Sequence, residues 1–171
     1  MLILMAGLPG GGKTTLAREL ARITGGILLS KDEIRFTLFG AETEYSTSQD
    51  DFVMEIMLQV AEYSFRRDPQ RLVFLDGRTF SRQYQRDRVI QFAASIEQPW
   101  RILECVCSEE SARRRLVAEP DPSHPARNRS FDLYLEVRGR FEPIPAPKTI
   151  ISTDEPISTC IQHALAAIRS T

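Results

Sequence analysis

Short apolar runs alternate with longer amphipathic segments along the whole chain. Five of these runs predict β-strands, at residues 2–6, 26–30, 71–76, 101–107 and 148–152. Between them, apolar residues recur at three- and four-residue spacing, which is typical of helices that bury one face. This alternation predicts a parallel sheet with helices on both faces, a three-layer α/β fold. In such folds, ligands bind beyond the carboxyl ends of the strands.

Capping residues and helix breakers indicate where the helices begin and end. The first helix is expected over residues 13–23, before a pair of glycines. Ser48 is expected to cap a long helix that ends near a proline, and Ser81 is expected to cap the next. Further helices are expected after Ser108 and over residues 156–168. The apolar face expected to be buried on the long helix consists of Phe52, Val53, Ile56, Met57, Val60 and Ala61.

The most informative motif lies between the first strand and the first helix. Residues 7–14 read Gly-Leu-Pro-Gly-Gly-Gly-Lys-Thr and match the pattern G-x-x-x-x-G-K-[ST]. Small residues let backbone N–H groups surround a phosphate, and the start of the helix adds partial positive charge. Lys13 is expected to reach the β- and γ-phosphates of ATP, and the Thr14 hydroxyl is expected to hold Mg²⁺. The residues predicted to bind the nucleotide here are Gly7, Pro9, Gly10, Gly11, Gly12, Lys13, Thr14 and Thr15.

Asp32 and Arg35 follow the second expected strand, at the edge of the sheet beside the phosphate loop. A carboxylate there can accept the proton of an attacking hydroxyl and also contact Mg²⁺. Arg35 shares a helical face with Asp32 and can hold it ionised or bind a substrate anion. The alternative is structural, with Ser30 capping a helix, Asp32 suiting its N-terminal charge and Arg35 solvated. Spacing alone does not decide between the two.

The third expected strand ends in Asp76, which is the usual place for a second carboxylate on the Mg²⁺ side of a phosphate loop. The alternative is a strand-ending turn at Asp76-Gly77. Arg78, Arg82 and Arg86 follow at four-residue spacing and can form a basic stripe that faces a substrate phosphate. For Arg86, a solvated helix face is at least as good an interpretation.

An irregular, proline-containing segment with arginine-rich flanks follows the fourth expected strand. We expect a lid at about residues 110–140 that closes over the site. Closure would bring positive charge to a phosphoryl transition state. The arginines that can supply this charge are Arg113, Arg114, Arg115, Arg127 and Arg129.

Composition limits the class of protein. The chain has 171 residues, which fits a single domain over residues 1–171. Its net charge is -1 and its pI is near 6.2, so a nucleic-acid partner is possible through a local patch but is not favoured. Three cysteines without metal or disulfide spacing fit reduced thiols in a cytoplasmic protein. No run of about 18 apolar residues predicts a membrane span, and the oligomeric state stays open.

These features in this order resemble the small P-loop kinases with a polynucleotide-kinase-like domain, often described as AAA-type ATP-binding domains. The resemblance rests on the phosphate loop, Asp32-x-x-Arg35, the strand that ends in Asp76, the arginine-rich segment and Phe141-Glu142-Pro143. Polynucleotide 5′-hydroxyl kinases, chloramphenicol phosphotransferase and zeta-toxin-like kinases belong to this group. The resemblance implies a three-layer P-loop NTPase fold whose five-stranded parallel sheet has the order 2-3-1-4-5.

The resemblance also implies roles for single residues. Asp32 would activate the substrate hydroxyl, Arg35 would bind near the reacting phosphate, and Arg113 or Arg127 would contact ATP. The chain departs from the group in two places. Residues 76–79 read Asp-Gly-Arg-Thr where polynucleotide kinases tend to carry Asp-x-Thr-Asn, and Glu119 stands where some members carry another lid arginine.

The function expected from the sequence is therefore ATP-dependent phosphoryl transfer to a hydroxyl of a small molecule. Lys13, Asp32 and Arg35 are the predicted catalytic residues, and Thr14, Asp32 and Asp76 are the predicted Mg²⁺ ligands. Two alternatives remain, a polynucleotide 5′-hydroxyl kinase and an ATP-binding or ATPase regulatory protein without an acceptor. The sequence lacks N-K-x-D, which argues against a guanine-specific switch. Residues 36–65 are expected to form much of the acceptor pocket.

Overall fold

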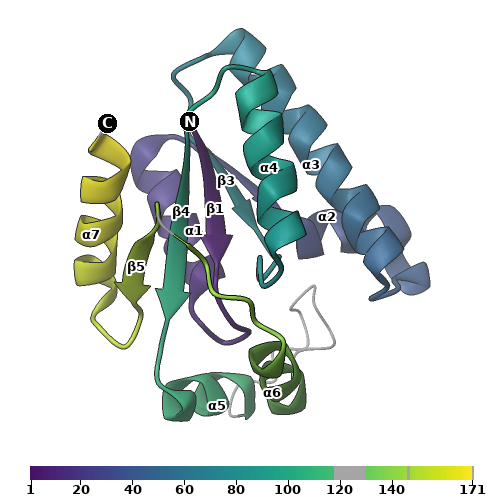
Figure 1. Ribbon diagram of the computed structural model, residues 1–171, viewed down its shortest axis with the longest axis vertical. Coiled ribbons are helices and arrows are strands. Elements are labelled where there is room, and N and C mark those ends of the chain that lie inside the picture. The colour runs from purple at the N-terminus through teal and green to yellow at the C-terminus, as the bar shows by residue number, and fades with distance from the viewer. Residues whose placement is uncertain (118–129, 146, 171) are drawn as a thin grey trace.

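The computed structural model describes residues 1–117, 130–145 and 147–170. Within this part of the chain, five parallel strands form one sheet in the order β2-β3-β1-β4-β5 (Figure 1), which confirms the expected fold class and strand order. Each strand begins and ends within two residues of its expected position. The strands are β1 (Leu2–Ala6), β2 (Ile27–Ser30), β3 (Val73–Asp76), β4 (Trp100–Val106) and β5 (Thr149–Ser152).

Helices cover both faces of this sheet. Figure 1 shows α1 and α7 on one side and α3 and α4 on the other. A short 3₁₀ helix, η1, links α2 to α3. The helical elements are α1 (Lys13–Thr24), α2 (Lys31–Phe39), η1 (Gly40–Glu42), α3 (Thr47–Arg67), α4 (Gln83–Ser95), α5 (Glu109–Val117), α6 (Phe131–Gly139) and α7 (Ile157–Arg169).

The central strand β1 is fully buried, because successive side chains of a strand point to opposite faces and both faces are covered. Leu2, Leu4 and Ala6 belong to the core cluster that includes residues of α3 and α4. Ile3 and Met5 belong to the second cluster, which includes residues of α1 and α7. This double burial fixes the carboxyl end of β1, and the phosphate loop begins there.

Two predicted caps are wrong by one or two residues. The side chain of Ser46, not Ser48, caps α3 by accepting a hydrogen bond from the Gln49 amide at 3.3 Å. The backbone of Ser46 is extended, so the helix starts directly after it and takes Ser48 into its first turn. Helix α4 begins at Gln83 with Arg82 as its N-cap residue, and Ser81 lies one position earlier.

The buried face of α3 is also rotated relative to the expected one. Phe52 and Val60 are exposed, at 56% and 39%, and Phe52 packs on the ring of Phe39 instead. The residues of α3 that are buried are Val53, Met54, Met57, Leu58, Ala61, Ser64 and Phe65. The helix carries apolar residues on more than one side, so the pattern alone did not single out the face that meets the sheet.

Helices α5 and α6 lie beyond the carboxyl ends of the strands (Figure 1). Ala112 and Leu116 of α5 pack against Phe131 and Tyr134 of α6, and Leu8 of the phosphate loop contacts this cluster. These helices fall within the expected lid. Residues 118–129, which include Arg127, Arg129 and Glu119, lie outside the described residues, so closure of a lid stays a prediction.

The cysteines are free thiols. Cys105 and Cys160 are buried and Cys107 is partly buried. Burial raises the pKa of Cys105 to about 12, so this thiol is protonated and unreactive near neutral pH. In the described part of the chain, none of the helices has both the length and the apolar character needed to cross a membrane.

Candidate functional site

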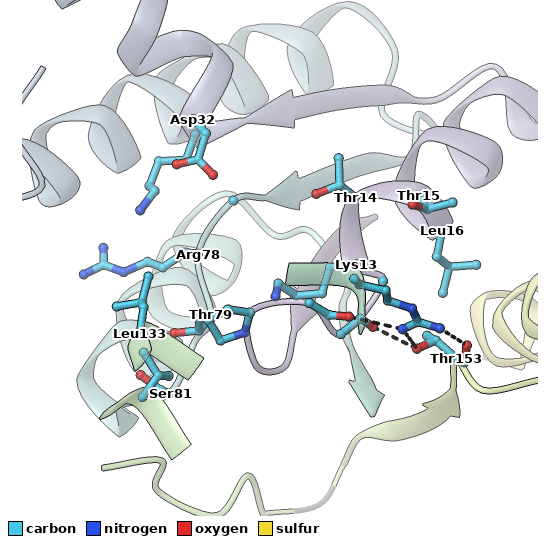
Figure 2. Close-up of a pocket in the computed structure, with 18 of the residues that line it drawn as sticks. Lys13, Thr14, Thr15, Leu16, Asp32, Arg78, Thr79, Ser81, Leu133 and Thr153 are labelled. Carbon is cyan, nitrogen blue, oxygen red and sulfur yellow. Dashed lines mark hydrogen bonds between the residues drawn. The ribbon is translucent and has the colours of Figure 1, made fainter. Parts of the chain in front are cut away.

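A cavity of about 1190 Å³ lies at the carboxyl edge of the sheet and contains most of the predicted site residues (Figure 2). We call it the cleft. Residues 9–15 of the phosphate loop line it, together with Asp32, Arg35 and residues 77–79. Gly7 lies outside the lining, beneath the loop. Figure 2 shows Asp32 and Arg78 on one side of the cleft and Lys13 on the other.

The phosphate loop is closed by its own lysine. Gly12 adopts a left-handed conformation, φ 77°, as the N-cap of α1, so Lys13 opens the helix. The buried Lys13 Nζ donates hydrogen bonds to the carbonyl oxygens of Gly7 and Leu8, at 2.9 and 2.8 Å. The lysine therefore lies across the loop at the start of α1, where backbone N–H groups and the helix dipole favour an anion.

Thr14 and Asp76 come together at the centre of this edge. The Thr14 hydroxyl donates a hydrogen bond to Asp76 Oδ2 at 2.7 Å, although the two residues are far apart in sequence. Asp76 is 1% exposed, and among the described residues its Oδ1 atom has no hydrogen-bond partner. A buried carboxylate oxygen without a donor, beside a hydroxyl, is chemistry that fits a hard cation such as Mg²⁺. The predicted ligands Thr14 and Asp76 therefore suit the metal.

Asp32 and Arg35 lie on the first turns of α2. Ser30 caps this helix by accepting a hydrogen bond from the Glu33 amide, as the structural interpretation expected. Arg35, however, is 2% exposed, so that interpretation is wrong about its solvation. Arg35 Nη1 lies 3.6 Å from Asp32 Oδ1, and this buried cation favours the ionised form of the carboxyl.

The end of β3 packs directly on the start of α2. Ser30 pairs with Asp76 in the sheet register. At Gly77, where φ is +89°, a Cβ atom would lie 2.9 Å from Lys31 Cβ and 3.1 Å from the Asp32 amide. Only glycine fits this contact. Asp76-Gly77 is therefore a strand-ending turn, as one interpretation expected. The same turn also brings the end of β3 against the helix that carries Asp32, so it is compatible with a Mg²⁺-side carboxylate at Asp76 as well.

Lys31 is a cleft residue that sequence reasoning missed. Its Nζ atom lies 3.0 Å from Asp50 Oδ2 on α3, and Asp50 also pairs with Arg35. Burial lowers the pKa of Lys31 to about 7, and the nearby cations Arg35 and Arg78 act in the same direction. The position of Lys31 directly after a strand was a usable signal, but the partner on α3 was not visible from the sequence.

The three arginines that follow Asp76 separate into two groups. Arg78 and Arg82 line the cleft, as the basic-stripe interpretation expects. Arg86 is 3% exposed, which contradicts the solvated-face interpretation. Its guanidinium donates to the carbonyl oxygens of Phe80, Glu142 and Pro143 and ties two loops together.

The arginines of α5 also differ in place. Arg113, which was predicted to contact ATP, lies 3.8 Å from the centre of the Phe131 ring and outside the cleft lining. Arg114 and Arg115 line the cleft instead. Arg115 donates to the carbonyl oxygens of Gly10 and Thr153, at 3.1 and 2.7 Å. The sequence offered no way to rank three consecutive arginines, because their order on the helix face depends on how α5 docks.

Thr153 is another cleft residue that the sequence analysis missed. It follows β5 directly, and its hydroxyl donates to the Gly11 carbonyl oxygen at 3.1 Å. Figure 2 shows Thr153 beside the phosphate loop, at the end of the cleft opposite Asp32. Its place at the carboxyl end of a strand was a signal that could have been read.

Comparison with solved structures shows a shared fold. The APS kinase CysC of Mycobacterium tuberculosis, in complex with AMPPNP and APS, matches with a TM-score of 0.72 at 18% identity over 99% of this chain and 97% of that chain. Kti12 of Chaetomium thermophilum, in complex with ADP-AlF3, matches with a TM-score of 0.66 at 21% identity over 99% and 100%. A gluconokinase of Sinorhizobium meliloti 1021 matches with a TM-score of 0.68 at 11% identity over 98% and 90%.

Comparison with curated protein sequences gives no significant match. The model of one protein family, described as "AAA domain", matches residues 2–143, which include the phosphate loop, Asp32, Asp76 and α5. Sequence motif, strand order and family match agree. The chain therefore belongs to the AAA domain family and has the fold of a small P-loop kinase-like protein.

Proposed function

We propose that this protein transfers the γ-phosphoryl group of ATP to a hydroxyl group of a small molecule. The observation that carries the proposal is the position of Asp32, which lines the same cleft as Lys13 and Thr14. An ATPase needs room only for a water molecule beside its base, and a protein that only senses ATP needs no base, so neither needs a carboxylate held beside a wide cavity. A transferase does, because an acceptor hydroxyl must lose its proton as it attacks.

The nucleotide would lie along the phosphate loop. Backbone N–H groups and Lys13 would bind its phosphates, and Arg115 and Thr153 lie at the end of the cleft where the base would follow. Thr14 and Asp76 would hold Mg²⁺, which neutralises charge on the phosphates when it is bound. The assignment of Mg²⁺ to this place rests on the hydrogen bond between Thr14 and Asp76 and on Asp76 Oδ1, which has no hydrogen-bond partner among the described residues.

Asp32 would act on the acceptor. Its carboxylate accepts the proton of the attacking hydroxyl, and Arg35 keeps that carboxylate ionised until the hydroxyl arrives. Helices α5 and α6 lie beyond the strand ends, and by closing over the cleft they would exclude water and so favour transfer over hydrolysis.

The test is Asp32→Asn with Glu33→Gln as its matched control. Asparagine keeps the shape of the side chain but cannot accept the proton. We expect Asp32→Asn to lower kcat for transfer of labelled phosphate, on acceptors found by screening hydroxyl compounds, by about a hundredfold or more while ATP affinity changes little. Glu33 is about half exposed and lies outside the cleft lining, and its ion pair with Arg18 is solvent-exposed, so its variant should keep wild-type turnover.

Three results would contradict the proposal in different ways. Unchanged kcat in Asp32→Asn would show that Asp32 is not the general base. ATP hydrolysis without transfer to any compound in the screen would favour a regulatory ATPase. Transfer to oligonucleotide 5′-hydroxyls and not to small molecules would favour a polynucleotide kinase.

A further inference from the structure

The end of the cleft away from Thr153 has an unusual set of charges. We call it the acceptor lobe, and it is lined by Lys31, Asp32, Arg35, Tyr45, Asp50, Arg78, Arg82 and Tyr84. The cations Lys31, Arg35 and Arg78 are each less than 10% exposed. Charged side chains at this depth need partners, and the nature of those partners indicates what the lobe binds.

The guanidinium group of Arg78 has two neighbours, a carboxylate and an aromatic ring. Its Nη2 atom donates to Asp51 Oδ1 at 2.7 Å, and its guanidinium lies 5.9 Å from the centre of the Tyr84 ring. Asp51 is half exposed and lies outside the cleft lining. The carboxylate therefore holds the guanidinium from outside the lining, the Tyr84 ring lies beside it within the lobe, and among the described residues no carboxylate of the lining forms an ion pair with Arg78.

Arg35 is fixed in a similar way. It pairs with Asp50 and Asp32, and its guanidinium lies 5.2 Å from the centre of the Tyr45 ring. Asp50 is shared with Lys31, so one carboxylate serves two buried cations. Both arginines are thus oriented before any ligand arrives, which lowers the entropy lost on binding.

The charges of the acceptor lobe do not balance on its inner surface. Lys31, Arg35, Arg78 and Arg82 face two carboxylates of the lining, those of Asp32 and Asp50, when the described residues are counted. The carboxylate that binds Arg82 belongs to Glu142, which is outside the lining. Burial lowers the pKa of both Lys31 and Arg35, and the nearby positive charge of Arg78 acts in the same direction.

Two guanidinium nitrogens also lack acceptors. The Nε atoms of Arg35 and Arg78 are buried and have no hydrogen-bond partner among the described residues. An unsatisfied donor on a buried cation is costly. An oxyanion is the ligand group that adds negative charge to the inner surface of the lobe and accepts from the guanidinium groups, because its oxygens match the guanidinium fork.

We propose that the acceptor carries a carboxylate or phosphate group, and that Arg78, together with Arg35, binds this group in the acceptor lobe. The inference rests on the proposed function and adds the substrate class to it. The arginines would anchor the anionic end of the acceptor and leave its hydroxyl beside Asp32. A neutral compound of the same size supplies neither negative charge nor a matching pair of acceptor oxygens to the two guanidinium groups, so it should bind more weakly.

The experiment measures anion binding without any need for turnover. The protein is loaded with AMPPNP and Mg²⁺, so that the phosphate loop is filled, and the side-chain Nε–Hε NMR signals of Arg35 and Arg78 are followed. Inorganic sulfate should shift both signals in a saturable way. Glycerate and glycerol 3-phosphate separate carboxylate from phosphate as the preferred group, and glycerol is the neutral control that should leave the signals in place.

Variants assign the effect to Arg78. Arg78→Met should weaken sulfate binding by about tenfold or more. Arg88→Met is the matched control, because Arg88 is exposed, pairs with Glu55 and lies outside the cleft lining. Arg78→Lys keeps the charge without the fork, so it guards against misfolding and should bind with intermediate affinity. Far-UV circular dichroism checks each fold.

The inference is overturned if sulfate, glycerate and glycerol 3-phosphate leave the two signals unchanged, if glycerol shifts them equally, or if Arg78→Met binds sulfate as wild type does. Failure of the proposed function looks different, since it appears as loss of AMPPNP binding or as absence of phosphoryl transfer to any hydroxyl compound. The two outcomes are therefore read from separate measurements.

Discussion

Lys13 shows how one residue joins loop stability to ligand binding. Its ammonium group bonds to the carbonyl oxygens of Gly7 and Leu8, so it stabilises the loop and also places a positive charge at the start of α1. The same group would have to reach the β- and γ-phosphates during transfer. Its geometric and electrostatic roles can be separated by substitution.

We predict that Lys13→Ala lowers turnover by about a hundredfold or more, because a donor aimed at developing charge is lost. A cooperative urea unfolding transition should show that the variant is folded in the absence of urea, because the loop glycines and the core beneath them are unchanged. Calorimetric titration with ATP and Mg²⁺ measures the affinity. Lys148→Ala, which removes a lysine outside the cleft lining, is the control. Wild-type affinity and turnover in Lys13→Ala would rule out the phosphate-loop assignment.

At the residue scale, the sequence located the phosphate loop and Asp76 because each follows a strand directly. It left the role of Asp32 undecided, because the same residues suit the capped start of a helix and a catalytic site at the edge of the sheet. Burial of Arg35 contradicts only the solvated arginine of the structural interpretation, and burial is a tertiary property, so the catalytic role of Asp32 stays a prediction. Lys31 and Asp50 were missed for the same reason, because their contact depends on how α3 packs on α2.

At the scale of elements, Arg86 joins the loop before α4 to the segment after α6. It donates to carbonyl oxygens of Phe80, Glu142 and Pro143, and the Glu142 side chain accepts from the Gln83 amide and from Arg82. These hydrogen bonds lower the pKa of Glu142, first through the Gln83 amide and then through Arg82. The loop that carries Arg78 is therefore anchored to the end of α6.

We predict that Arg86→Met destabilises the protein by about 2–4 kcal/mol, because three carbonyl oxygens lose a charged donor inside the fold. Urea unfolding measures this change. Arg88→Met, on the same helix but exposed, should cost about 1 kcal/mol or less. Equal stability of the two variants would show that the loop is held by other contacts.

Helices α5 and α6 are the elements that we expect to respond to nucleotide. Arg115 of α5 contacts both the phosphate loop and Thr153, so a nucleotide bound between them would touch this helix. We predict slower hydrogen exchange over residues 109–117 and 131–139 when AMPPNP and Mg²⁺ are added. The second half of α3, residues 58–67, serves as the internal reference. Identical exchange with and without AMPPNP in the two helices would contradict a lid.

Element type and order were predictable because strands and helices differ in apolar period and because glycines and prolines separate them. Exact starts were not, since Ser46 and Ser48 both suit an N-cap and only the backbone conformation selects one. The buried face of α3 was misplaced because Phe52 finds a partner in Phe39 of α2, away from the sheet. The sheet order came from the family resemblance rather than from any local pattern.

For the whole molecule, Lys31 links folding to pH. Its pKa is about 7 in the folded protein and near 10.5 in the unfolded chain. Between these values the unfolded chain binds a proton that the folded chain lacks, so the contribution of Lys31 makes stability rise with pH across this window. Below about pH 7, Lys31 is charged in both the folded and the unfolded chain, so its contribution to stability no longer changes with pH.

We predict that the stability difference between wild type and Lys31→Met shifts toward wild type as pH rises from about 7 to 10, by at most about 1.4 kcal/mol per pH unit. Urea unfolding of both proteins across this range measures the difference, and subtraction removes the other titrating groups. Lys148→Met controls for loss of a lysine elsewhere. A pH-independent difference would mean that Asp50 keeps Lys31 charged throughout.

The pairing of Ser30 with Asp76, together with the contact between Gly77 and the start of α2, sets the spacing of the two carboxylates proposed to act in the reaction by backbone alone. Asp32 and Asp76 cannot be moved independently without breaking strand pairing. Other residues of the acceptor lobe come from other segments: Tyr45 lies in the loop before α3, Asp50 on the first turn of α3 and Tyr84 on α4. The proposed catalytic carboxylate and the two arginines proposed to bind the acceptor, Arg35 and Arg78, thus belong to one backbone unit, and only the outer part of the acceptor lobe comes from other segments and can diverge among related proteins while that unit stays fixed.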